Sequence, residues 1–308
     1  MPISCHSGAV MVVGSANLDV VVNVPRIPEF GETLLGSNVS HLPGGKGLNQ
    51  ACAAGNTGVQ TFFVGAVGDD THGDVLLAAL RANSVNTEDT AVMPNQDSGT
   101  AHILVSDAGS NQIVVVPAAN GLVTIENVLA ALQRHPEANT LVLQGEIPFD
   151  VCEAAAEAVE TRGGRTVFNL APAAHVSSRL LSLADPLVVN EFEAGIVLNQ
   201  DAPTDADTAM EAARSLMEFS RSVIITLGSK GAVVGENGVF TYVPAEKVDI
   251  VVDTTGAGDA FVGVVAAELA TGASLLAAAN RANHAAGLTV TRVGASPSYG
   301  AIEDLYEA

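Results

Sequence analysis

The feature that most constrains the fold is an alternation of short apolar segments with amphipathic segments along most of the chain. The apolar segments are rich in β-branched residues, as strands are: AVMVVGS, TFFVGAVG, TLVLQGEIP, TVFNLAP, PLVVNE, SVIITLG and DIVVDTT. Between them the apolar residues recur at helical spacing, as in HGDVLLAALRAN, TIENVLAALQRH and ADTAMEAARSLMEFS. Strands that are apolar on both faces and alternate with helices predict a three-layer α/β fold, with a mostly parallel sheet flanked by helices.

Two stretches interrupt this alternation. Residues from about 19 to 41 and from 99 to 116 contain short β segments and turn residues with no helix between them. They predict a small antiparallel sheet that stands off the main sheet as a lid. The length of 308 residues accommodates one large domain with such an appendage, so we expect a single domain over residues 1–308. We also expect a homodimer through the lid, because its apolar edge needs cover.

Charge and cysteine usage limit the partners and the location. Thirteen Lys plus Arg against 34 Asp plus Glu give a formal net charge of −21, which opposes nucleic acid and anionic membranes. A phosphate ligand must therefore be held by local donors. The first apolar run is interrupted by Gly14, Asn17 and Asp19, which argues against a signal peptide or a membrane-spanning helix. Three cysteines without a C-x-x-C pair predict a reducing, cytoplasmic location.

The segment DTTGAGDAF, residues 253–261, places small residues between a predicted strand and a predicted apolar helix. Small residues let a ligand approach the backbone, and the free amides of a first helical turn favour an anion. Asp259 lies in that turn and has two interpretations. It stabilises the helix dipole, or it accepts a proton from a hydroxyl that attacks the bound anion. The segment by itself leaves both open.

Other polar residues lie where predicted strands end, which is where open α/β sheets bind ligands. They are Asn17 and Asp19 after the first strand, the loop from Gly45 to Asn49, Glu146 after LVLQG, Asn190 and Glu193 in VVNEFE, and the turn from Thr226 to Gly231. Taken singly, each also suits a local role in a turn, in a helix cap or at the surface.

Taken together, LPGGKGLNQACAAGNTG and DTTGAGDAFVGVVAAELATG resemble the paired signatures of the ribokinase-like (PfkB) family of carbohydrate kinases. GSANLDVVVNVPRIPEFGET, VGAVGDDTHG, NEFEA, TLGSKG and VTRVGASPS fall in the family's order, so the resemblance covers nearly the whole chain. The two interrupting stretches fall where the family has its β-lid. The resemblance implies an ATP-dependent sugar kinase, and the expected reaction is phosphorylation of ribose at its 5-hydroxyl.

The resemblance also implies roles for individual residues. Asp259 would be the catalytic base, and the amides of Gly256, Ala257 and Gly258 would form the anion hole for the transferred phosphoryl group. Asp19 and Asn49 would hold ring hydroxyls, and the rest of the sugar pocket would come from Asn17, Gly45, Lys46 and Glu146. The nucleotide would contact Asn190, Thr226, Gly228, Ser229, Lys230, Gly231, Gly258 and Asn283.

Two ions are implied in addition to ATP. Glu193 would belong to a water-mediated Mg²⁺ site, although a Glu at a helix start also suits the dipole. The family's monovalent-cation loop, whose carbonyl and hydroxyl oxygens suit K⁺, matches Asp253, Thr255, Thr289, Arg292, Gly294 and Ser298.

Three alternatives remain open. A related kinase would act on deoxyribose, fructose, 2-keto-3-deoxygluconate or a nucleoside. A non-catalytic sugar or nucleotide sensor shares the scaffold, because fold does not determine function, although the intact Asp259 argues against it. A dinucleotide-binding oxidoreductase is disfavoured, because VVGSAN after the first strand lacks the G-x-G-x-x-G pattern.

Overall fold

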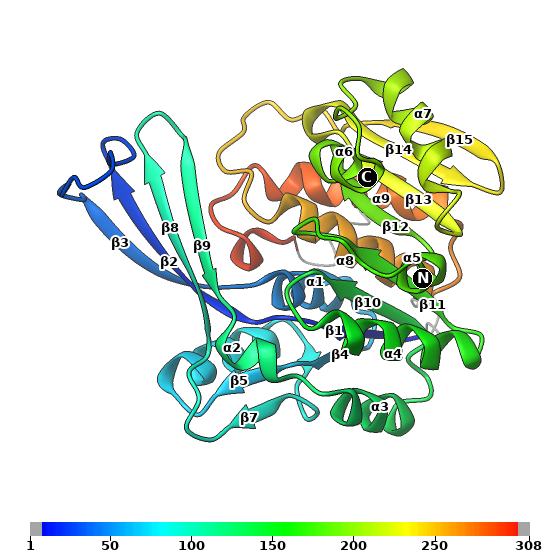
Figure 1. Cartoon of the computed structure of the whole chain (residues 1–308), viewed down its shortest axis with the longest axis horizontal. Coiled ribbons are helices and arrows are strands. Elements are labelled where there is room, and N and C mark those ends of the chain that lie inside the picture. Colours follow the sequence, from blue (N-terminus) through cyan, green and yellow to red (C-terminus); the bar gives the residue numbers. More distant parts are fainter. Residues whose placement is uncertain (1–7, 301–308) are drawn as a thin grey trace, which may run out of the picture.

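The computed structural model describes residues 8–300, and its main body is a nine-stranded sheet with helices on both faces (Figure 1). The strand order is β15-β14-β13-β12-β11-β10-β1-β4-β6. Neighbours from β6 to β13 pair in parallel, and β14 and β15 add an antiparallel hairpin at one edge. The predicted three-layer, mostly parallel fold is therefore confirmed. The strands of this sheet are β1 (Val10–Val13), β4 (Thr61–Val64), β6 (Val85–Asn86), β10 (Thr140–Gln144), β11 (Arg165–Asn169), β12 (Leu187–Asn190), β13 (Ser222–Thr226), β14 (Gly231–Glu236) and β15 (Val239–Pro244).

The helices cover the two faces of the sheet in two groups. In β1, Val10 and Val12 join one hydrophobic cluster and Met11 and Val13 the other, because successive side chains of a strand point to opposite faces. The first cluster includes α1, α2, α8 and α9, and the second includes α3 to α7. The helices are α1 (Lys46–Gly55), α2 (Thr71–Ala82), α3 (Ile125–Arg134), α4 (Phe149–Thr161), α5 (Ser178–Leu183), α6 (Glu191–Leu198), α7 (Ala206–Leu216), α8 (Ala257–Ala270) and α9 (Leu275–Thr289), with short 3₁₀ helices η1 (Ala118–Leu122), η2 (Gly228–Lys230) and η3 (Ser296–Ser298).

A four-stranded sheet projects from the main body, at the left of Figure 1, and forms the lid. Its order is β3 (Asn38–Gly44), β2 (Asn17–Val24), β8 (Gly99–Ser106) and β9 (Asn111–Val116). The two outer pairs are antiparallel, as expected. The central pair, β2 and β8, is parallel, with Asn17 opposite Gly99, because both strands leave the main body at the same end. A separate two-stranded sheet contains β5 (Ala66–Gly68) and β7 (Ala91–Met93).

One predicted strand is wrong. The segment DIVVDTT, residues 249–255, forms no strand, and Ile250, Val251 and Val252 are exposed. The hairpin of β14 and β15 occupies the edge of the sheet next to β13, and residues 249–255 pair with none of its strands. This segment is held by bonds such as that from the Val252 amide to the Val290 carbonyl, at 2.7 Å.

Two further expectations concern the membrane and the cysteines. None of the helices within residues 8–300 has both the length and the apolar character needed to cross a membrane. Cys52 and Cys152 are buried free thiols, and Cys5 lies outside the described residues.

Candidate active site

Two helices begin side by side at the edge where the parallel strands end. The N-cap residues are Gly45 for α1 and Gly256 for α8, with φ of 88° and 78°. Such positive φ values favour glycine. An added Cβ would also lie 2.7 Å from the Asn17 amide at Gly45 and 2.7 Å from Ala295 Cα at Gly256. Both glycines are therefore required by the close packing of backbone around the site.

The start of α1 is filled by oxygens of the protein. Oε2 of Glu146 accepts from the Lys46 amide at 3.1 Å and from the Ser15 hydroxyl at 2.5 Å. The Gly47 amide donates to Ser15 Oγ at 3.3 Å, and the Leu48 amide donates to the Ser15 carbonyl at 2.8 Å. Glu146, just after the end of β10, thus fixes the start of α1 by accepting from the Lys46 amide. It caps this helix and also lies beside the expected sugar pocket.

The start of α8 faces open space. Gly256, Gly258 and Asp259 line a cavity of about 170 Å³, and the Ala257 amide makes a bond of 3.3 Å to the Thr254 carbonyl. The Asp259 carboxylate accepts from Asn49 Nδ2 at 3.0 Å through Oδ2 and from Gln50 Nε2 at 2.9 Å through Oδ1. Asp259 therefore sits in a held orientation at a helix start that lines a cavity, an arrangement suited to proton acceptance next to an anion.

Charged side chains gather around this point. Burial, followed by the charges of Glu146 and Asp259, raises the pKa of Asp19 from 3.8 to about 7. Burial also raises the pKa of Glu193. For Lys46, burial lowers the pKa, but three neighbouring carboxyl groups outweigh burial and raise it: Asp259, Glu146 and Glu193. The lysine thus remains a cation beside these three acids.

The residues expected in the sugar pocket fall into two groups. Asp19, Lys46, Asn49 and Glu146 come together near Asp259, and the Oδ1 atom of Asn49 is buried without a partner among the described residues. That oxygen has the capacity to accept a hydrogen bond from a ligand, and a buried polar atom left unpaired is costly. Asn17 is 2% exposed, and its Oδ1 accepts from Asn120 Nδ2 at 2.7 Å, which ties the base of the lid to η1.

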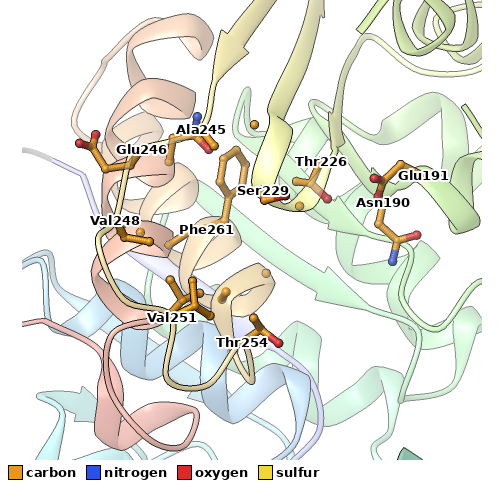
Figure 2. Close-up of a pocket in the computed structure, with 18 residues that line it drawn as sticks. Asn190, Glu191, Thr226, Ser229, Ala245, Glu246, Val248, Val251, Thr254 and Phe261 are labelled. Atoms are coloured by element: carbon orange, nitrogen blue, oxygen red, sulfur yellow. The ribbon is translucent and has the colours of Figure 1, made fainter. Parts of the chain in front are cut away.

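A larger cavity of about 410 Å³ lies next to the first (Figure 2). Val248 and Val251, on the segment before α8, lie across it from Thr226 and Ser229. Its mixture of apolar and hydroxyl groups fits a flat, polar-edged ligand such as a nucleoside. Of the residues expected to contact the nucleotide, seven line it: Asn190, Thr226, Gly228, Ser229, Gly231, Gly258 and Asn283. The structure does not bring Lys230 to this cavity, because its ammonium donates to the Thr204 carbonyl at 2.5 Å.

Asn190 and Glu193 form a reciprocal cap at the start of α6. Asn190 Oδ1 accepts from the Glu193 amide at 2.8 Å, and Glu193 Oε2 accepts from the Asn190 amide at 2.9 Å. Glu193 also lines the smaller cavity with Lys46 and Asp259. Both residues therefore cap α6 and also line a cavity of the site.

Part of the expected cation loop comes together. Asp253 accepts from the Thr255 amide at 2.9 Å through Oδ1 and from the Gly294 amide at 2.9 Å through Oδ2. Burial raises the pKa of Asp253, but a hydrogen bond from the Thr255 hydroxyl at 2.7 Å, together with these two amide bonds, outweighs burial and lowers it. The other hydroxyls bond locally, Thr289 to the Ala285 carbonyl and Ser298 to the Ala295 carbonyl. Arg292, on the same loop, donates its amide to the Thr289 carbonyl at 3.1 Å. Within residues 8–300, no three His, Cys, Asp or Glu side chains group closely enough to hold a metal ion.

The sequence analysis missed three buried amides that contact the site from below: Gln50, Gln144 and Asn169. A signal was present, because each is an uncharged polar residue next to an apolar run: Gln50 before ACAA, Gln144 after LVL and Asn169 after VF. Such residues need buried partners, so a buried network was to be expected.

Comparison with known proteins identifies the family of the chain. The family described as pfkB family carbohydrate kinase matches residues 8–301. The chain belongs to this family. It is 35% identical over 299 residues to a ribokinase of Bacillus subtilis, covering 96% of this chain and 98% of that protein. It is 32% identical over 300 residues to a deoxyribokinase of Salmonella typhi, covering 97% of each. The structure of Arabidopsis thaliana ribokinase complexed with ribose and ATP matches with a TM-score of 0.88 at 29% identity, over 98% of both chains.

Proposed function

We propose that this carbohydrate kinase transfers the γ-phosphoryl group of ATP to the 5-hydroxyl of D-ribose, giving ribose 5-phosphate. The observation that carries the proposal is the position of Asp259. It lines the cavity of about 170 Å³, which lies next to the cavity of about 410 Å³, and it accepts a hydrogen bond from Asn49 of the expected sugar pocket. The Bacillus subtilis relative is a ribokinase, and the Arabidopsis thaliana structure is described with ribose and ATP, which supports the choice of substrates.

The chemistry follows from the two sides of Asp259. Oδ2 of Asp259 takes the proton of the 5-hydroxyl, whose oxygen attacks the γ-phosphorus while the bond to the ADP oxygen breaks. The amides of Gly256, Ala257 and Gly258 stabilise charge on the transferred phosphoryl oxygens. Asp19, with the unpaired Asn49 Oδ1, orients the sugar by accepting from its ring hydroxyls. Lys46 supplies positive charge beside the acids that surround the reacting groups.

Two ions complete the proposal. We assign Mg²⁺ to the side of the smaller cavity that holds Glu193, where water-mediated contact and the ATP phosphates would bind it. The ion would neutralise charge on the phosphates. We assign K⁺ to the loop joined by Asp253 and Gly294, with backbone carbonyls and Asp253 as hard oxygen ligands. The hydrogen bonds already made by Asp253 support an effect of this ion on the order of the loop.

We also propose a homodimer through the lid and a cytoplasmic location. All six residues of the edge strand β9 are exposed, including Ile113 at 54% and Val114 at 63%. An exposed apolar edge strand favours pairing with another chain. Sedimentation velocity would test it, and a monomer at micromolar concentration would contradict the dimer. The buried free thiols of Cys52 and Cys152 suit a reducing compartment.

The decisive experiment is a phosphotransfer assay with ATP and Mg²⁺ over ribose, deoxyribose, fructose, 2-keto-3-deoxygluconate and a nucleoside. We expect the highest kcat/KM with ribose. A preference for deoxyribose would instead match the activity named for the Salmonella typhi relative, which makes it the second candidate. Binding of sugar and ATP without transfer to any acceptor would identify a sensor.

A further inference from the structure

A buried chain of side-chain amides connects Asp259 to the ends of three strands. Gln50, on α1, is at its centre and is 0% exposed. Its Nε2 donates to Asp259 Oδ1 at 2.9 Å and to Asn169 Oδ1 at 3.0 Å. Its Oε1 accepts from Gln144 Nε2 at 2.9 Å. Both hydrogens of the Gln50 amide and its oxygen are therefore engaged.

The neighbours of Gln50 permit only one orientation of its amide. Asn169 Nδ2 donates to the Val188 carbonyl at 3.1 Å, so Asn169 presents its oxygen to Gln50. Gln144 presents its nitrogen to Gln50. A flipped Gln50 would place its oxygen against two oxygens and its nitrogen against a nitrogen. The ends of β10, β11 and β12 thereby direct the Gln50 NH₂ group at Asp259.

Gln50 is not placed to contact a ligand itself. It is fully buried and lines neither the cavity of about 410 Å³ nor that of about 170 Å³. An apolar side chain would fill this position of α1 without the cost of burying an amide, which must be offset by hydrogen bonds. Three nearby residues of α1 that are equally buried are apolar: Leu48, Ala51 and Cys52 are also 0% exposed.

We propose that Gln50 is a positioning residue for phosphoryl transfer: by holding Oδ1 of Asp259, it turns Oδ2 toward the attacking sugar hydroxyl. This inference rests on the proposed function, because Gln50 acts only through the base. Oδ2 already accepts from Asn49 Nδ2 at 3.0 Å, on the sugar side, and a carboxylate oxygen has capacity for a second donor. Restricting the carboxylate in advance removes orientational freedom that would otherwise slow the reaction.

The primary test is Gln50→Met, which keeps the length and burial of the side chain but cannot donate. We expect kcat with ribose to fall about 10- to 100-fold, with KM for ribose and for ATP unchanged. Thr57→Val is the matched control. It removes two buried hydrogen bonds just beyond the end of α1, from Thr57 Oγ1 to the Ala54 carbonyl at 2.6 Å and from the Val59 amide to Thr57 Oγ1 at 3.4 Å, and should leave kcat unchanged.

A double-mutant cycle separates positioning from general damage to the fold. In an Asp259→Asn background, Gln50→Met should no longer lower the residual turnover, because the group through which it acts is gone. An equal loss in both backgrounds, or unchanged kcat in Gln50→Met alone, overturns the proposal. A wild-type protein that phosphorylates no sugar refutes the proposed function instead, so the two failures are distinguishable.

A second variant covers the case in which Gln50→Met does not fold. Gln144→Met leaves Gln50 in place but removes the donor to Gln50 Oε1, one of the contacts that fix the orientation of the amide. We expect kcat to fall about 3- to 10-fold with KM unchanged, and only when Asp259 is present. Unchanged kcat in this variant overturns the proposal as well.

Discussion

The starts of α1 and α8 share their geometry and differ in what they face. Each begins at a glycine with positive φ, Gly45 or Gly256. The first amides of α1 donate to Ser15 and Glu146, so they are satisfied within the protein. The first turn of α8 lines a cavity and carries Asp259. A glycine at a helix start therefore does not by itself make an anion site, because the surrounding oxygens decide whether the amides remain available.

The substitution expected to lower turnover most strongly is Asp259→Asn, at the open start of α8. The amide keeps the shape of the side chain at the open helix start but cannot take a proton at neutral pH. We expect turnover to fall about 10²–10⁴-fold, while the melting temperature and ATP affinity stay close to wild type. Steady-state kinetics, thermal melts and ATP titration measure the three quantities. Turnover near the wild-type value would remove the base from the mechanism.

A matched pair of glycine variants distinguishes packing from function at the start of α8. At Gly256, an added Cβ would meet Ala295 Cα at 2.7 Å in a backbone with positive φ. At Gly258 it would meet no described heavy atom within 4 Å, although Gly258 lines both cavities.

We expect Gly256→Ala to lose about 1–2 kcal/mol of stability or more, and Gly258→Ala to lose none. Both should lose turnover, by about 10²-fold, because both disturb the donors to the phosphoryl group. Melting temperature and kcat are measured side by side. Wild-type turnover in a stable Gly258→Ala would show that the transferred group does not bind at this helix start.

On the α1 side, Asp19→Ala should alter sugar binding and the pH dependence of stability. We expect KM for ribose to rise about 10- to 100-fold and KM for ATP to stay unchanged, because ring hydroxyls lose a buried partner. Equal changes in the KM for ribose and the KM for ATP would show that Asp19 has a turn or packing role and does not bind the sugar.

The sign of the pH effect follows from the raised pKa. Since the pKa of Asp19 is about 7 in the folded state and 3.8 as the reference value, the folded state binds more protons between these pH values. The free energy of unfolding contributed by this group therefore falls as pH rises from about 4 to 7. Asp19→Ala should flatten that decline in melts from pH 5 to 8. A steeper decline in the variant would contradict the assigned cause.

The smallest expected effect concerns the loop behind α8. Asp253 joins this loop to Gly294, so a cation bound there would order the backbone that leads to Gly256. We expect K⁺ in place of Na⁺, at constant ionic strength, to raise kcat several-fold, or about 1 kcal/mol of barrier, and Asp253→Ala to abolish the response. Equal kcat in the two salts for the wild type would exclude the ion from the mechanism.

The sequence alone determined the layers of the fold, because hydrophobic periodicity is a local property that each segment carries by itself. The alternation of segments gave the parallel sheet, and the two interruptions gave the lid. The same method misassigned residues 249–255, whose β-branched composition resembles a strand, because the edge of the sheet was already occupied. It also passed over the hairpin of β14 and β15, although Asn237 and Gly238, with φ of 52° and 77°, form a typical hairpin turn signal.

Only the tertiary structure decided which of two similar helix starts is open and which is filled. The motifs placed Gly45, Gly256 and Asp259 correctly in their turns, but the oxygens that satisfy α1 come from Ser15 and Glu146, which follow the ends of β1 and β10. The donors that hold Asp259 lie 209 and 210 residues away along the chain. Hydrogen bonds between such distant residues depend on how the strands and helices pack, and no local pattern in the sequence records them.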